Sequence, residues 1–137
     1  MEKITIQATI VADIQKVWNY YTEPAHITQW NFATDDWQCP SASNDKKVGG
    51  KYIARMEAKD GSFGFDFEAT YNDIKEKEYF LYTMPDNRTV AVTFKEISDD
   101  ATSIVIVFDA ETINPIEMQR DGWQAILNNF KKYTENN

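Results

Sequence analysis

Few side chains in this sequence have the types and spacing that enzymatic chemistry requires. His26 is the only histidine, and it lies near the start of a predicted helix with no serine or cysteine partner recognisable nearby. A nucleophilic triad needs a nucleophile whose proton a neighbouring base can take, and the sequence does not support one. We therefore expect no catalytic residue, and a surface or capping role for His26.

Metal and phosphate chemistry have no better support. The chain has one histidine, the single cysteine Cys39, and carboxylates scattered over strand faces and turns, so no set of residues has metal-ligand spacing. Pairs such as Asp99 and Asp100 arise by chance in an acidic chain. Gly49-Gly50 opens a strand rather than a helix, so it is not a phosphate-binding loop. We expect neither a metal nor another cofactor.

Aromatic residues are the more informative group, because many of them fall in the central strands. The set expected to face inward mixes many rings with few aliphatic side chains: Trp30, Tyr52, Met56, Phe63, Phe65, Phe67, Tyr71, Tyr82 and Trp123. Buried tyrosine hydroxyls and tryptophan N–H groups need hydrogen-bond partners, which a pocket holding water or a ligand with a few oxygens provides. The alternative interpretation is that these rings simply fill a core.

The charge balance limits the partners. The chain has 14 Lys and Arg residues against 22 Asp and Glu, a net charge of -8, which opposes nonspecific binding to nucleic acid or anionic membranes. It begins directly with a strand pattern, without a basic-then-apolar leader, and no apolar run approaches membrane-spanning length. Cys39 has no cysteine partner in the chain. We expect a cytoplasmic protein whose residues 1–137 form one domain.

A long C-terminal helix must help to position these side chains, and its start is well marked. Asn114 is predicted to cap it, and Pro115 suits the first helical position. Gly122 costs about 1 kcal/mol relative to alanine in a helix interior, so its presence predicts close approach of another group. The apolar stripe at helical spacing consists of Ile116, Trp123, Ile126, Leu127, Phe130 and Tyr133.

The N-terminal part predicts one strand followed by two short helices. Apolar and polar residues alternate over residues 4–10, as in a strand with one buried face. Asp13 is a plausible cap for a first helix, and Pro24 suits the first turn of a second that runs to about Trp30. Residues 39–50 are predicted to form a loop, because Pro, Ser, Asn, Asp, Lys and a Gly-Gly pair dominate them.

A run of strands follows. Segments 51–59 and 62–74 flank Asp60-Gly61, a pair typical of tight hairpins. Residues 79–84, 89–96 and 102–109 supply further strands, separated by polar turns. One face of the second segment is expected to look inward and carries Phe63, Phe65, Phe67, Ala69 and Tyr71.

This order of elements predicts an α+β, helix-grip fold in which a curved antiparallel sheet of about six or seven strands wraps around the terminal helix. Five segments carry a family resemblance: VWNYYTEPAHITQWN (17–31), DW (36–37), VGGKY (48–52), FEATYNDI (67–74) and QRDGWQAILNNFKKY (119–133). Together they resemble the activator of Hsp90 ATPase homologue 1-like family, within the START-like, polyketide-cyclase-like superfamily. The resemblance covers nearly the whole chain.

The resemblance implies a hydrophobic cavity between the sheet and the terminal helix, which the superfamily uses for lipids, sterols, polyketides and other apolar ligands. Fold alone does not choose a function. We favour a module that binds a small apolar ligand. The alternatives are a protein-interaction role with the Hsp90 chaperone and a cyclase-like enzyme using Tyr82, Glu111 or Arg120. The expected binding site encloses roughly 300 to 1,000 Å³, and its residues are Trp30, Tyr52, Met56, Phe65, Phe67, Tyr71, Tyr82 and Trp123.

Overall fold

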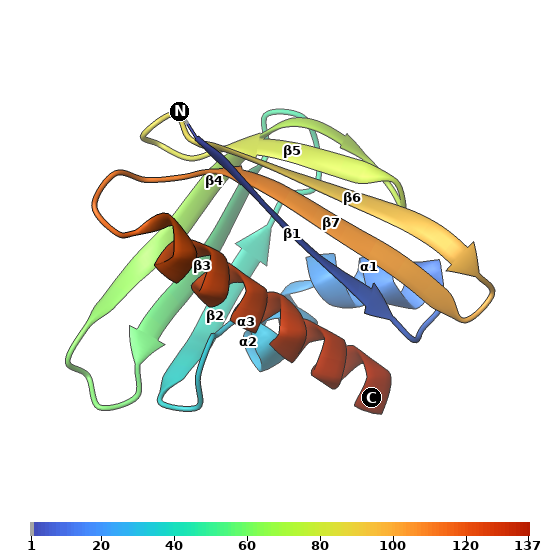
Figure 1. The fold of residues 1–137 in the computed structure, drawn as a ribbon, viewed down its shortest axis with the longest axis horizontal. Helices are drawn as coiled ribbons and strands as arrows, with labels where there is room; N and C mark the ends of the chain where they lie inside the picture. Colours follow the sequence, from blue (N-terminus) through green and yellow to red (C-terminus); the bar gives the residue numbers. More distant parts are fainter. Residues whose placement is uncertain (1) are drawn as a thin grey trace.

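The computed structural model describes residues 2–137 and has the predicted α+β helix-grip architecture (Figure 1). One antiparallel sheet has the strand order β1-β7-β6-β5-β4-β3-β2. The elements, in chain order, are β1 (Lys3–Ile10), α1 (Ile14–Thr22), α2 (Pro24–Trp30), β2 (Trp37–Asn44), β3 (Lys51–Ala58), β4 (Gly64–Lys75), β5 (Tyr79–Thr83), β6 (Thr89–Ser98), β7 (Ala101–Asp109) and α3 (Ile116–Asn136).

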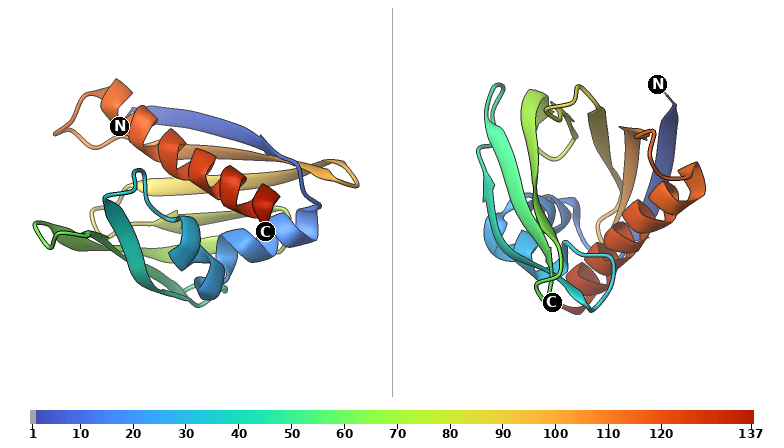
Figure 2. Two further views of the ribbon diagram at one scale, coloured as in Figure 1. Left: turned by 90° about the horizontal axis from the view of Figure 1, so that it is seen from below. Right: turned by 90° about the vertical axis from the view of Figure 1, so that its left-hand side faces the viewer.

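The sheet curves, and α3 lies across its open side (Figure 2). Two side chains of α3 attach the helix to β1, an edge strand. Gln124 Nε2 donates to the carbonyl oxygen of Gln7 at 3.2 Å, and Lys131 Nζ donates to that of Thr9 at 2.7 Å. These bonds use carbonyl groups that an edge strand would otherwise leave unpaired. The opposite face of α3 turns toward the concave side of the sheet.

The two short helices begin and end close to the predicted residues. Asp13 Oδ1 accepts a hydrogen bond from the backbone N–H of Lys16 at 2.9 Å, as an N-cap does. Pro24 occupies the first turn of α2. His26 then joins α2 to α3, because its Nδ1 is hydrogen-bonded to the hydroxyl of Tyr133 at 2.8 Å and its ring stacks on Tyr20. These contacts give His26 a structural role at the junction of the three helices.

The start of α3 differs from the prediction. The helix begins at Ile116, Pro115 is its N-cap, and no side chain caps it. The backbone of Pro115 is extended, with ψ 147°, so the helix starts one residue later than predicted and Asn114 lies before the cap position. Gln119 orders the helix start instead: its Nε2 donates to the carbonyl oxygen of Asn114 at 2.8 Å, and its Oε1 accepts from the backbone N–H of Glu111 at 2.9 Å.

The predicted loop over residues 39–50 is also wrong, because β2 occupies its first half. This strand pairs with β3 from Trp37 opposite Ala58 to Asn44 opposite Tyr52, with a register shift between Gln38 and Ser41. The turn-like composition fits an edge strand, where a proline can be accommodated at a bulge without losing a bond of the central sheet. Edge pairing with β3, rather than local propensity, makes this segment a strand.

Gly122 does not mark a close approach, contrary to the prediction. A Cβ atom placed on it would have nothing within 4 Å. The glycine therefore faces open space on α3. No steric requirement for glycine exists at this position.

The inward face of β4 is shorter than predicted. The Asp60-Gly61 turn forms, with Gly61 at φ +78°, and Ala69 and Tyr71 are buried while Phe67 is partly buried. Phe63, however, precedes β4 and is 61% exposed, and Phe65 is 42% exposed. The β3–β4 hairpin projects past α3 in Figure 1, so no helix covers these two rings. They contact Trp37 instead, with ring centroids 6.0 and 6.3 Å from it.

The core lies between the concave face of the sheet and the three helices. Trp18 of α1, Phe108 of β7 and Phe130 of α3 are its largest fully buried side chains. In the described chain, none of the helices combines the length and apolar character needed to cross a membrane.

Candidate functional site

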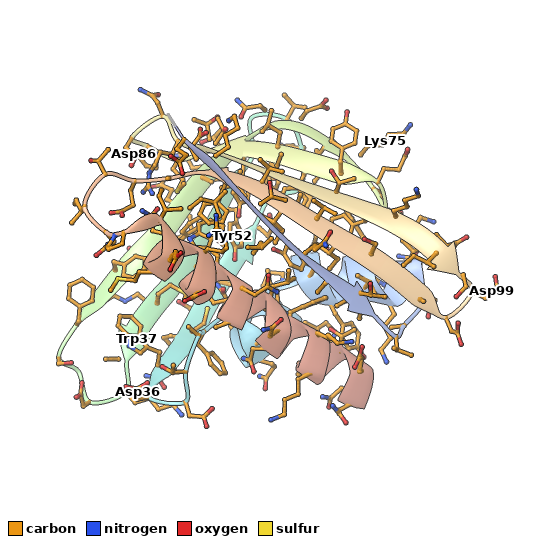
Figure 3. The ribbon with its side chains drawn as sticks, viewed as in Figure 1. Asp36, Trp37, Tyr52, Lys75, Asp86 and Asp99 are labelled. Carbon is orange, nitrogen blue, oxygen red and sulfur yellow. The ribbon has the colours of Figure 1, made fainter. Side chains whose placement is uncertain are left out.

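A cavity of about 170 Å³ remains inside the curved sheet, beneath α3. It is smaller than the volume predicted from sequence, because bulky rings occupy much of the space. It is still comparable with the engineered cavity of about 150 Å³ that holds benzene. In Figure 3 the side chain of Tyr52 lies in the space between α3 and the strands. The lining side chains are Tyr21, Thr22, Trp30, Asn31, Asn44, Tyr52, Met56, Phe65, Phe67, Tyr71, Phe80, Tyr82, Ile106, Trp123, Ile126 and Leu127.

All eight residues of the predicted binding site line this one cavity. The structure thus brings together residues from α2, from β3, β4 and β5, and from α3. Strand alternation explains why the residues of β3, β4 and β5 meet here, since inward positions of neighbouring strands converge on the concave face of a curved sheet. Their role in binding stays a prediction.

One part of the cavity is apolar and partly open. Trp123 of α3 stacks on Phe108, with centroids 4.0 Å and planes 11° apart, and meets Phe67 edge-on at 6.2 Å. Phe65 lies at the exposed end, 42% accessible. Trp123 and Phe67 are themselves only partly buried. We call this more exposed group of rings the mouth of the cavity.

The other part is polar and buried. Tyr52 and Tyr82 have near-parallel rings 5.7 Å apart, and Tyr71 pairs directly with Tyr82 across β4 and β5. The Tyr71 hydroxyl donates to Asn44 Oδ1 at 2.7 Å. Asn44 Nδ2 in turn donates to the carbonyl oxygen of Thr22 at 2.7 Å, which ties β2 to the end of α1. The side chains at this end are therefore held in fixed positions by hydrogen bonds and ring contacts.

Burial changes the acidity of these tyrosines. Desolvation raises the pKa of Tyr21, Tyr52 and Tyr82 well above the usual value, and their mutual proximity raises it further for Tyr52 and Tyr82. Desolvation also raises the pKa of Tyr71 to about 12, although its bond to Asn44 opposes the shift. All four phenols are consequently protonated at neutral pH and able to donate hydrogen bonds.

Sequence reasoning missed part of the polar lining of the site: Tyr21, Thr22, Asn31 and Asn44. The sequence patterns did not indicate that Tyr21, Asn31 or Asn44 reaches the cavity. Asn31 follows the end of α2, and Asn44 lies in the edge strand that was predicted as a loop. Neither position belongs to an apolar alternation or a helical stripe, which were the patterns available. Ile126 and Leu127 were correctly placed on the inner stripe of α3.

The acid–base candidates do not come together. Tyr82 lines the cavity, but Glu111 and Arg120 do not. The carboxylate of Glu111 accepts a hydrogen bond from the backbone N–H of Asn114 at 2.7 Å, in the loop before α3, and Arg120 is exposed. Among residues 2–137, no group of three or more His, Cys, Asp or Glu side chains is arranged to hold a metal ion.

Comparisons with known proteins agree on one family. The family model described as "Activator of Hsp90 ATPase homolog 1-like protein" matches residues 11–135. The solution structure of the AHSA1-like protein from Aeromonas hydrophila is 39% identical, covers 98% of this chain and 93% of its own, and superimposes with a TM-score of 0.91. No curated protein matches.

Two further structures extend the likeness. A protein from Cytophaga hutchinsonii is 49% identical over 98% of this chain and 92% of its own, with a TM-score of 0.84. A protein from Chromobacterium violaceum is only 21% identical, over 98% of this chain and 99% of its own, yet has a TM-score of 0.86. The fold therefore persists where most residues differ.

Proposed function

Because the chain belongs to the activator of Hsp90 ATPase homolog 1-like family, we propose that it acts as a binding module for a small apolar ligand that enters beneath α3. The observation that supports this function is a cavity of about 170 Å³ with a predominantly aromatic wall. A cavity this size fits a molecule of one or two rings. Packing alone would close such a void, since empty volume in a core lowers stability.

Affinity in such a site comes mainly from removing apolar ligand surface from water, at about 25 cal/mol per Å². Since none of the lining side chains among the described residues is charged, binding should depend only weakly on salt. The two lining tryptophans, Trp30 and Trp123, should sense occupancy, whereas Trp37, which does not line the cavity, should not.

The experiment is a titration with bromobenzene, an apolar ring whose bromine quenches tryptophan fluorescence on contact. Saturable quenching is expected from the wild type, and Phe67→Ala should weaken it or shift the preference toward larger rings, since Phe67 lines the cavity. Glu68→Ala is the matched control, because Glu68 is the next residue on β4, turns outward and pairs with Lys51 at 3.0 Å. Quenching that never saturates would contradict the proposal.

A second candidate is interaction with an Hsp90-type chaperone, which the name of the family suggests. The exposed rings of Phe63 and Phe65 and the partly buried ring of Trp37, whose centroids lie 6.0 to 6.3 Å apart, form an apolar surface of the kind that contacts other proteins. Stimulation of Hsp90 ATPase activity by the wild type and its loss in Phe63→Ser would favour this role. The free, buried Cys39 fits the cytoplasmic location that we propose for either function.

A further inference from the structure

Hydroxyl groups at the polar end of the cavity are only partly used by the protein. Tyr71 donates to Asn44. The Tyr52 oxygen accepts from Asn31 Nδ2 at 3.4 Å, but its own proton has no acceptor among the described residues. Within residues 2–137, the hydroxyl of Tyr82 has no hydrogen-bond partner either, although the residue is only 6% exposed.

The Tyr82 hydroxyl must face the cavity. Thr134 Oγ1 is the one fully enclosed polar side-chain atom in residues 2–137 that lacks a partner. The Tyr82 oxygen is therefore not fully enclosed by protein atoms, and because the residue is 6% exposed and lines the cavity, we infer that this oxygen faces the cavity. An unpartnered buried donor is costly, and a ligand acceptor or a water can satisfy it.

Charge sets a second condition on the ligand. None of the sixteen lining side chains within the described residues carries a charge. A carboxylate placed here would lose its hydration without gaining a cationic partner, which is strongly unfavourable. Because burial raises the pKa of Tyr52 and Tyr82 well above the usual value, these phenols offer protons rather than negative charge. The site therefore combines an apolar wall with neutral donors.

We propose that the cavity selects neutral, ring-containing ligands with one hydrogen-bond acceptor oxygen, such as a ketone, and excludes carboxylates. The ring lies against Trp123 and Phe67 near the mouth, and the acceptor oxygen receives hydrogen bonds from Tyr82 and Tyr52. This inference rests on the proposed function and adds the chemical class of the ligand. It assigns Tyr82 and Tyr52 as the residues that determine specificity.

Three probes of similar size test it: acetophenone, a ketone; ethylbenzene, its hydrocarbon counterpart; and benzoate, the anion. Dissociation constants are measured by NMR titration for the wild type, Tyr82→Phe and Tyr52→Phe. Tyr79→Phe is the matched control, because its hydroxyl lies outside the cavity and bonds to Asp73 at 2.6 Å. Water solvates the ketone better than the hydrocarbon, so the decisive quantity is the ratio of the two constants and how each variant changes it.

Removing one donor should weaken acetophenone relative to ethylbenzene by about three- to tenfold, the worth of one neutral hydrogen bond. Tyr79→Phe should leave the ratio unchanged, and benzoate should bind at least tenfold more weakly than acetophenone. Binding of ethylbenzene by each variant shows that its cavity is intact, and if one variant fails to fold, the other supplies the ratio.

An unchanged ratio in the folded variants, or benzoate binding as tight as that of acetophenone, would overturn the inference while ethylbenzene binding still supports the proposed function. If neither neutral probe binds the wild type, both proposals fail.

Discussion

The indole of Trp123 lies flat on the ring of Phe108, with centroids 4.0 Å and planes 11° apart, and so fixes α3 to β7 beside the cavity mouth. Because the indole is partly exposed, Trp123→Ala should lower the free energy of unfolding by about 2 to 3 kcal/mol, less than a fully buried tryptophan. Urea unfolding measures the loss. Trp123→Phe retains a ring and should lose less than half as much; equal losses would show that stacking does not matter.

Substitution of Gly122 should raise the free energy of unfolding rather than lower it. Since a Cβ atom there would meet nothing within 4 Å, Gly122→Ala should raise the free energy of unfolding by roughly 1 kcal/mol through better helix propensity. Gly50→Ala is the contrasting variant, because its Cβ would lie 2.1 Å from the carbonyl oxygen of Asp45 and must displace it. Thermal unfolding compares the two variants. A lower melting temperature for Gly122→Ala than for the wild type would support the close approach that the sequence predicted.

The Asn44 side chain links three elements. Its removal should therefore lower stability more than removal of an ordinary edge-strand side chain. Asn44→Ala removes an acceptor from Tyr71 and a donor from the carbonyl oxygen of Thr22. Leaving buried polar groups without partners should lower the free energy of unfolding by about 1 to 3 kcal/mol. The neighbouring exposed residue provides the control, Ser43→Ala, which should change stability by less than about 0.5 kcal/mol. Chemical denaturation distinguishes these outcomes.

Asp109 makes stability depend on pH in the acid range. Its carboxylate bonds to Lys3 Nζ at 2.6 Å and to the backbone N–H and hydroxyl of Thr89 at 2.8 and 2.9 Å, which lowers its pKa from 3.8 to about 2. A carboxyl with a lowered folded pKa stabilises fully above its unfolded pKa and loses that contribution as pH falls toward the folded value. Wild-type stability should therefore decline between about pH 4 and 2.

Unfolding titrations of Asp109→Asn should show a flatter decline over this range, together with lower stability at neutral pH. Asp99→Asn, in the β6–β7 turn, should keep the wild-type slope because Asp99 makes no side-chain hydrogen bond in residues 2–137. Parallel slopes for the wild type and Asp109→Asn would show that the Lys3 and Thr89 contacts do not control this carboxyl.

The parts of the fold that sequence predicted correctly have local causes. The Asp13 cap, the proline at the start of α2 and the Asp60-Gly61 turn each depend on residues within one turn of chain. The β2 strand was missed because its conformation depends on pairing with β3. Its own polar residues show no strand pattern.

The lining residues of the cavity likewise include some that local patterns predict and some that depend on tertiary packing. Phe67, Tyr71 and Tyr82 lie at inward positions of regular strands, so alternation was enough to predict them. Asn31 and Asn44 reach the cavity only because α2 packs against β2. That packing is tertiary, and no periodicity within either segment reveals it.

The most direct test of ligand binding in the cavity is a methyl NMR titration with ethylbenzene that locates the ligand. Intermolecular NOEs are expected to Met56, Ile106 and Leu127, which line the cavity from β3, β7 and α3, and none to the exposed Val48 and Ile97. Absence of any saturable shift, or NOEs confined to the rings of Trp37 and Phe63 outside the cavity, would contradict ligand binding inside the sheet.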